Sequence, residues 1–416
     1  MKYNVNDKLP LGALALYGTQ WFVLAIAVVT TSVFVATGTP AEKLFFAQKL
    51  FAVMGITGLL QVLIGHRLPI VVGPAAVLLV GVLSALGAGA SNTAIYSSIA
   101  VGGAFILLLN IGGLLRYVQR LFSARSVIVI LMLIALTLAP VIRNLIFPPT
   151  ANNEEHTFGL IFTLIALPLM VMMNGRLRGV AKSLVIPIVL VLGSVAYGIC
   201  FGYELNTATS ASLDTLLIPH FEFDLGVMIA FLICYIALLI NDIGSIESLG
   251  AMLGSDNMDS RLRRGIRLTG VMNIISGALG VLGPVNYSMS PGVIASTGCA
   301  SRYALIPSTL LLLLCAFSPE LIAILTAIPN SVIGVILLFL MGTQLAASFE
   351  MMHSTHAIGS FGEALNVGIP LMVAMLCQLM PHGIVPSVIE PLIGNGFAMG
   401  VVTVLLMEHV INRVNR

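Results

Sequence analysis

The residues with the clearest chemistry in this sequence are two carboxylates inside an apolar stretch, Asp242 and Glu247. An ionised carboxylate accepts hydrogen bonds from ligand N–H groups and can take up a proton. Because the two are five residues apart, about 140° around a helix, one helical face cannot present both equally. We therefore expect one of them to bind a ligand and the other to be structural, with both as candidate proton carriers. A solvated helix end is the alternative for Glu247, and a purely structural role is the alternative for Asp242.

Two short segments, 68–87 and 284–301, share a second pattern. Each has an extended apolar stretch, then a small residue before a proline, Gly73-Pro74 or Ser290-Pro291, and then a short helical stretch. We expect Gly73 and Ser290 to be helix N-caps, with each proline at the first helical position. Helix N-termini present free N–H groups, so two breaks in corresponding positions predict a site for a polar ligand. The alternative is that both prolines only improve helix packing.

Further candidate ligand-contact residues lie in the first apolar run. Gln20 offers an amide, and Trp21, the only tryptophan, offers a stacking surface, although a membrane-interface role is the alternative for a tryptophan. His353 and His356 have a spacing that could ligate a metal, but no third ligand is nearby, so we predict no metal site. The full set of candidate ligand-contact residues is Gln20, Trp21, Gly73, Ala75, Glu247, Tyr287, Met289 and Ser290.

The composition indicates that membrane spans position these residues. Of 416 residues, 58% are hydrophobic and only 9% are charged, and the mean hydropathy of +1.06 lies far above that of soluble domains. The formal net charge of +2, without a basic stripe, excludes a nucleic-acid-binding protein. The five cysteines show no metal-ligand spacing, so we interpret them as small buried hydrophobic residues.

Apolar runs of spanning length recur along the whole chain. They lie near 11–37, 44–65, 93–115, 126–147, 157–175, 183–202, 225–253, 265–282, 304–317, 319–346, 366–380 and 392–411. With the two broken segments the count is fourteen crossings, which places both termini on one side. If that side is the cytoplasm, all of the 19 Lys and Arg residues except Lys43, Lys49 and Arg143 lie there, as the positive-inside rule predicts.

The two broken segments form the third and tenth crossings, which run in opposite directions. This arrangement predicts an all-α polytopic fold of fourteen transmembrane segments in seven-plus-seven inverted repeats, typical of secondary transporters with a binding site near the bilayer midplane. The sequence shows no nucleophile–base pair and no metal cluster, so we do not expect an enzyme.

The whole chain resembles the nucleobase–ascorbate transporter (nucleobase:cation symporter-2) family, which includes uracil, xanthine and uric acid permeases. The matching residues are Gln20, Gly65-His66-Arg67-Leu68-Pro69, Gly73, Ile246-Glu247-Ser248-Leu249-Gly250, Gly292-Val293-Ile294, Thr297-Gly298-Cys299-Ala300-Ser301-Arg302 and Ala327-Ile328-Pro329-Asn330-Ser331-Val332-Ile333-Gly334. The chain departs from the family pattern at Met289 and Ser290, where the family has Gln or Glu followed by Asn. It also departs at Trp21, where the family usually has His.

The resemblance implies short antiparallel strands in crossings 3 and 10, a core domain (1–115 and 225–317), a gate domain (116–224 and 318–416), and a homodimer in the cytoplasmic (inner) membrane. It also implies that Glu247 hydrogen-bonds a nucleobase, without a cofactor. We predict proton-coupled uptake of a purine or pyrimidine of the xanthine, uracil or urate class, with Glu247 and Asp242 as candidate proton carriers. An anion transporter of the related sulfate or bicarbonate type is the alternative.

Overall fold

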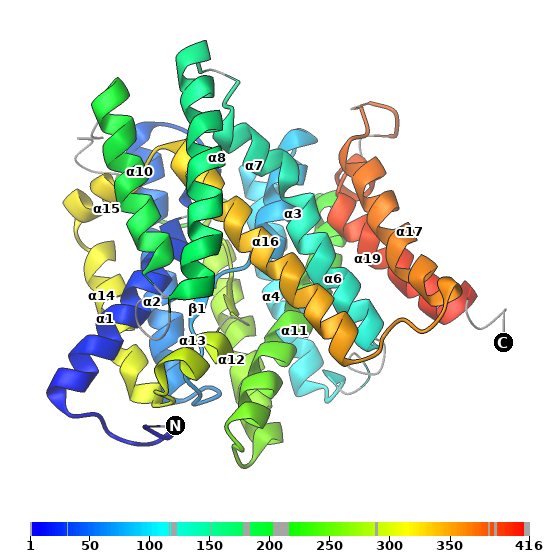
Figure 1. Ribbon diagram of the computed structural model, residues 1–416. Helices are drawn as coiled ribbons and strands as arrows, with labels where there is room; N and C mark the ends of the chain where they lie inside the picture. The colour runs from blue at the N-terminus through cyan, green and yellow to red at the C-terminus, as the bar shows by residue number, and fades with distance from the viewer. Residues whose placement is uncertain are drawn as a thin grey trace.

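The computed structural model describes residues 2–30, 32–115, 117, 123–149, 151–177, 184–202, 216–287, 290–381, 383–386 and 389–411, and most of them are helical (Figure 1). The first half contains α1 (Leu11–Thr30), η1 (Val33–Val35), α2 (Pro40–Leu63), β1 (Val72–Pro74), α3 (Ala76–Gly87), α4 (Asn92–Ile111), α6 (Ala124–Thr137), α7 (Ala139–Ile146), α8 (Asn153–Arg176) and α10 (Val185–Phe201). The second half contains α11 (Leu225–Met252), α12 (Met258–Ala278), β2 (Pro284–Asn286), α13 (Ser290–Thr297), η3 (Arg302–Ala304), α14 (Leu305–Ala316), α15 (Pro319–Thr326), α16 (Asn330–Ser354), α17 (Phe361–Gln378), α18 (Glu390–Ile393), α19 (Gly396–Leu406) and η4 (Met407–Ile411).

Eight helical segments in the described part of the chain are long and apolar enough to cross a membrane. A ninth is formed if the pair Arg302–Ala316 and Pro319–Leu325, bent by 98°, is counted as one span. Three shorter apolar helices, Ala76–Gly87, Val185–Phe201 and Gly396–Ile411, accompany them. The prediction of a multi-pass membrane protein is confirmed, whereas the count of fourteen crossings stays a prediction.

Polar side chains mark where several helices begin. Thr39 and Glu42 form a capping box at the start of α2, in which each side chain accepts a hydrogen bond from the other residue's backbone N–H. Single side-chain caps from Ser91, Asp224 and Ser360 begin α4, α11 and α17. These caps satisfy N–H groups that have no partner inside a helix, and so they fix helix starts that hydropathy alone leaves open.

The expectation of one continuous run over 319–346 is wrong, because this segment forms two helices. The first, α15, ends at Thr326, and α16 begins at Asn330. Pro329 stands at the N-cap of α16 with an extended backbone (ψ 141°). Proline lacks an N–H and disfavours helical geometry in the residue before it, so the helix stops ahead of Pro329 and restarts after it.

The helices pack into two groups that each combine both halves of the sequence (Figure 1). In the first group α4 packs along α12, α2 and α1 pack along α14, and α11 packs against α3 and α4. In the second group α16 packs against α6, α7, α8 and α10, while α17 packs against α6 and α19. No group is built from one half alone, so neither half of the sequence buries its apolar faces without the other.

Glycines allow the very close approach of α4 and α12. A Cβ added at Gly277 would lie 2.4 Å from the backbone nitrogen of Ala100, and one added at Gly103 would lie 2.6 Å from that of Ile274. Small residues that bring helix backbones together are a usual source of packing energy in membranes, where lipid is as apolar as the side chains. This contact fixes α12 against α4 and thereby positions β2, which follows α12.

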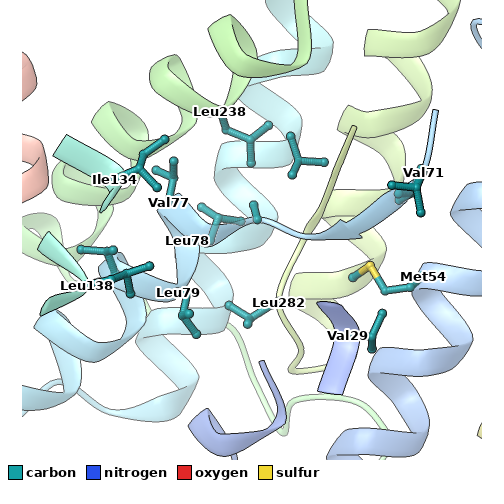
Figure 2. Close-up of a cluster of buried hydrophobic side chains, with 14 of the residues drawn as sticks. Val29, Met54, Val71, Val77, Leu78, Leu79, Ile134, Leu138, Leu238 and Leu282 are labelled. Atoms are coloured by element: carbon teal, nitrogen blue, oxygen red, sulfur yellow. The ribbon is translucent and has the colours of Figure 1, made fainter. Parts of the chain in front are cut away.

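The buried core surrounds β1 and α3. Figure 2 shows Val29 of α1, Met54 of α2, Val77 of α3 and Leu238 of α11 among the side chains that gather there, and all four are buried. A 12-residue helix is too short to span a bilayer on its own, and it is tolerated at membrane depth because neighbouring helices enclose it.

Candidate functional site

The two broken segments meet as an antiparallel pair of strands. Val72 pairs with Asn286, Gly73 with Val285, and Pro74 with Pro284, and all six residues are buried. Two backbone hydrogen bonds extend the pair, from Tyr287 N to Val71 O (3.0 Å) and from Ala75 N to Gly283 O (2.9 Å). The segments are far apart in sequence, so this pair is one of the places where the two halves of the chain join.

The predicted N-cap at Gly73 is wrong, because Gly73 and Pro74 belong to β1 and helix α3 begins only at Ala76. The strand pairing continues through Ala75 and leaves no room for an earlier helix start. Ala75 is the N-cap of α3 and provides no side-chain hydrogen bond. Proline at position 74 is compatible with this edge position, because its missing N–H is not needed for the pairing.

Ser290 and Tyr287 tie the two strands together. The Ser290 hydroxyl accepts a hydrogen bond from Val71 N (3.1 Å) and donates one to Tyr287 O (3.0 Å). The Tyr287 hydroxyl donates to Pro74 O at 2.6 Å. A Cβ at Gly73 would lie 2.4 Å from the Tyr287 ring, so glycine is needed for this close approach. The predicted N-cap at Ser290 is wrong as well, because Ser290 is already the first residue of helix α13 and its hydroxyl bonds the strand pair. Met289 lies outside the described residues.

Asp242 is fully buried and holds β2 in place. Its Oδ1 accepts hydrogen bonds from Asn286 N (2.9 Å) and Asn286 Nδ2 (2.7 Å), and its Oδ2 accepts one from Thr269 Oγ1 (2.8 Å). Ser245, on the same face of α11, donates to Asn286 O at 3.0 Å. The carboxylate therefore joins α11, α12 and β2, and a carboxylate with this many hydrogen bonds is typical of a structural group.

His66 and Gln61 extend this network to α2. Leu68 N donates to His66 Nδ1 (3.0 Å), so the ring's Nε2 carries the proton and donates to Asn286 Oδ1 (3.0 Å). Gln61 Nε2 donates to Gly265 O (3.0 Å) and to Thr269 Oγ1 (3.2 Å). No role was predicted for Asn286, Thr269 or Gln61, although polar side chains inside apolar runs are the pattern that could have identified them.

Glu247 lies in a different environment from Asp242, as their spacing predicts. Its side chain is exposed within the chain, like its neighbours Gly244 and Ser248, whereas Asp242, Ser245 and Ile246 are buried. A Cβ added at Gly244 would meet nothing within 4 Å, so the space beside it on that face is open. Helix α11 thus turns one polar face to the β2 network and another to an open region.

Gln20 and Trp21 are both buried in α1, which packs against β1. Trp21 is 2% exposed and belongs to the hydrophobic core. Gln20 is 3% exposed, and within the described part of the chain neither its Oε1 nor its Nε2 has a hydrogen-bond partner. An unpaired buried amide is costly, so Gln20 stays a candidate ligand-contact residue.

The spacing of His353 and His356 was weighed for metal binding, and no metal site was predicted there. The rings of His353 and His356 lie 6.4 Å apart between centroids, and the described residues hold no group of three or more His, Cys, Asp or Glu side chains able to bind a metal.

A crevice of about 440 Å³ lies between α3 and the group α7, α17 and α18. Its described lining residues are Phe34, Leu83, Ser84, Gly87, Ala88, Pro140, Val141, Asn144, Leu145, Cys377, Gln378, Met380, Glu390 and Gly394. This crevice could not be identified from the sequence. Its walls come from four segments that are far apart in the chain, and no local sequence pattern shows that they lie together.

Comparison of the sequence with known proteins gives matches over most of the chain. The model of the xanthine/uracil permease family, described as a permease family, matches residues 12–383. Uric acid permease PucJ of Bacillus subtilis is 24% identical over 85% of this chain and 82% of its own length. Nucleobase transporter PlUacP of Paenibacillus larvae is 23% identical over 85% of this chain and 83% of its own length.

Among solved structures, the transmembrane domain of the cyanobacterial bicarbonate transporter BicA is similar in fold. It has a TM-score of 0.62 and 16% sequence identity, and the match covers 98% of this chain and 99% of that one. At this identity the likeness shows the fold alone.

Proposed function

Because the chain belongs to this permease family, we propose that it is a secondary active transporter that takes up a nucleobase of the xanthine, uracil or urate class together with protons. The relatives named as uric acid and nucleobase transporters support this substrate class. The observation that carries the proposal is the exposed carboxylate of Glu247 on α11, the helix that holds β2.

Glu247 is proposed to bind the base. An ionised carboxylate accepts two parallel N–H bonds from a flat heterocycle, and charge-assisted hydrogen bonds of this kind are about twice as strong as neutral ones. The first N–H groups of α3 and α13, which follow the strand pair directly, are suited to donate to the carbonyl groups of the base. Tyr287, Ser290, Gly73 and Ala75 then shape the site around the strand pair, and Met289 and Trp21 stay candidates for ring contacts.

Gln20 is proposed to bind the base as well. Its amide presents an acceptor beside a donor, which complements the adjacent C=O and N–H groups of an oxo-substituted ring. Both atoms lack partners among the described residues, so a bound base would satisfy them together.

Glu247 is also the proposed proton carrier. Asp242 is the less suitable of the two, because it is fully buried and its carboxylate joins α11 to α12 and β2, whereas Glu247 is exposed. Protonation of Glu247 in one orientation and release in the other would couple base movement to the proton gradient.

We further propose the architecture that the resemblance implies. Fourteen crossings in two inverted repeats would form a core (1–115 and 225–317) that moves against a gate (116–224 and 318–416), in a homodimer of the inner membrane with cytoplasmic termini. The packing of α4 on α12 and of α16 on α6 to α10 is compatible with this division.

Uptake of labelled uracil, xanthine, urate, guanine and adenine tests the proposal, in cells that lack their own permeases. We expect one base to accumulate, and accumulation to collapse with a protonophore. Accumulation that a protonophore leaves unchanged would contradict proton coupling. If the protein reaches the membrane and no base enters, the nucleobase assignment is wrong, and the anion-carrier alternative, which has the same fold, is tested next with sulfate and bicarbonate.

A further inference from the structure

The crevice between α3 and α7, α17 and α18 has no role in the proposed binding site. One wall is the C-terminal end of α3, with Leu83 and Ser84. The facing wall combines Asn144 of α7 with Gln378 of α17 and Glu390 of α18. Its volume of about 440 Å³ falls within the range of small-molecule sites, roughly 300 to 1,000 Å³.

The crevice and Glu247 lie towards opposite ends of α11. Ser91, which follows α3 closely, donates a hydrogen bond to Glu222 at 2.5 Å, and Glu222 shortly precedes the first residue of α11. The end of α3 therefore lies beside the start of α11. Glu247 is near the other end of α11, about 30 Å away at 1.5 Å per residue. The bond between Asp242 and β2 is on the stretch of α11 between them, so the strand pair separates the two places.

Two polar side chains of the crevice have a buried oxygen without a partner among the described residues. Ser84 and Gln378, from opposite walls, each carry a buried side-chain oxygen without a hydrogen-bond partner in the described structure. Glu390 adds a carboxylate that accepts a hydrogen bond from Gly383 N at 3.1 Å. The negative charge of the Glu390 carboxylate disfavours an inorganic anion in the crevice. Apolar side chains such as Phe34 and Leu83 complete the walls.

We propose that this crevice is a second solute site, on the opposite side of the strand pair from Glu247, which binds an uncharged flat heterocycle. Gln378 Oε1 and the Glu390 carboxylate accept hydrogen bonds from ring N–H groups, and the Ser84 hydroxyl donates to a ring carbonyl. The apolar side chains cover the ring faces. This inference rests on the proposed function, because the same base would occupy the crevice before or after the site at Glu247.

Cys377 is a native reporter for this site, because it lines the crevice and is partly exposed. Cys200 is the one fully exposed cysteine among the five and is removed by Cys200→Ser, while Cys234, Cys299 and Cys315 are buried. The rate of maleimide labelling of Cys377 is then measured in lipid nanodiscs, with and without xanthine or uracil, at a mildly acidic pH where both bases are uncharged. Parallel samples carry Glu247→Gln, which removes the carboxylate of the other site.

We expect a base to slow the labelling of Cys377 about fivefold when its concentration is several times its Kd, in both the Cys200→Ser protein and its Glu247→Gln derivative. Gln378→Leu and Ser84→Ala should each reduce this protection. The matched control is Ser194→Ala on α10, which also removes a buried hydroxyl without a partner but lies outside the crevice, and it should keep the protection.

Three results would overturn the inference. The first is a transported base that fails to protect Cys377, which leaves the proposed function intact. The second is protection that disappears with Glu247→Gln, which assigns binding to the other site alone. The third is a change in labelling by Gln378→Leu without any effect of base, which makes these polar groups part of a closing contact only. Protection without uptake by the wild-type protein would support the crevice site and contradict the transport function.

Discussion

Asp242 and Glu247 are two carboxylates on one helix, and the structure treats them in opposite ways. Asp242 is fully buried, with three hydrogen bonds from Asn286 and Thr269. Glu247, less than two turns further along α11, is exposed beside Gly244 and Ser248. Both side chains are carboxylic acids in the same apolar helix, so the difference in their environments comes from the neighbouring elements. On the face of α11 that meets β2, Asp242 accepts hydrogen bonds that hold Asn286 in place. On the other face, Glu247 lies beside an open region.

The largest expected difference between Asp242 and Glu247 is in what each contributes to the stability of the protein. Asp242→Ala leaves two donors of Asn286 and the hydroxyl of Thr269 without an acceptor in the core, so the free energy of unfolding should fall by about 3 to 5 kcal/mol. Glu247→Ala, at the exposed position, should cost less than about 1 kcal/mol. Thermal unfolding of the purified proteins in detergent measures both changes. Equal losses of stability in the two variants would contradict a structural role for Asp242 and a ligand-binding role for Glu247.

The second effect is on transport. Glu247→Gln preserves size but replaces an acceptor with an N–H₂ group that faces the ring N–H groups of the base, so uptake should fall about 100-fold with little change in thermal stability. The initial rate of labelled base uptake measures it, with Glu350→Gln as a control because Glu350 is also an exposed glutamate on a long apolar helix. Full accumulation by Glu247→Gln would remove this residue from the site.

The smallest expected effect is on the affinity for the base and concerns Gln20. Its buried amide has no hydrogen-bond partner among the described residues, whereas Asp242 accepts three hydrogen bonds. Gln20→Leu removes two unpaired polar atoms, so the free energy of unfolding should stay the same or rise by about 1 kcal/mol. The affinity for the base should fall about tenfold. The control is Gln48→Leu, because Gln48 Nε2 donates to Ala316 O at 3.0 Å and its loss should lower stability without changing affinity. Binding titration and thermal unfolding are measured on the same samples. A loss of stability in Gln20→Leu would show that the amide has a structural partner.

Much of the fold could be predicted from the sequence, because lipid imposes simple rules on spans. Length and hydropathy located α2, α4, α8 and α11 within a few residues, and the two proline breaks located the segments that form β1 and β2. The sequence did not predict correctly those residues whose secondary structure depends on backbone pairing with a distant segment. Gly73 and Pro74 were expected at a helix start, and they form a strand because Pro284 and Val285 lie opposite them.

The candidate site could be predicted only in part, for a similar reason. The spacing of Asp242 and Glu247 predicted that they would face different ways, but not which one would be buried. That depended on Asn286, which reaches Asp242 only after β2 pairs with β1. The crevice at Ser84 and Gln378 could not be predicted, because it exists only where separate helices leave space between them.

The strand pair also has a consequence for how the chain is made. Tyr287 donates its hydroxyl to Pro74 across 213 residues of sequence, so β1 has no partner until most of the protein has been synthesised. An unpaired strand is unfavourable in lipid, and contacts between such distant residues form slowly. We therefore expect the segment from Leu68 to Gly87 to reach its final position only after the second half of the chain has inserted into the membrane. In a chain truncated before Pro284, β1 would stay unpaired, and membrane proteases should degrade that chain faster than the full-length protein.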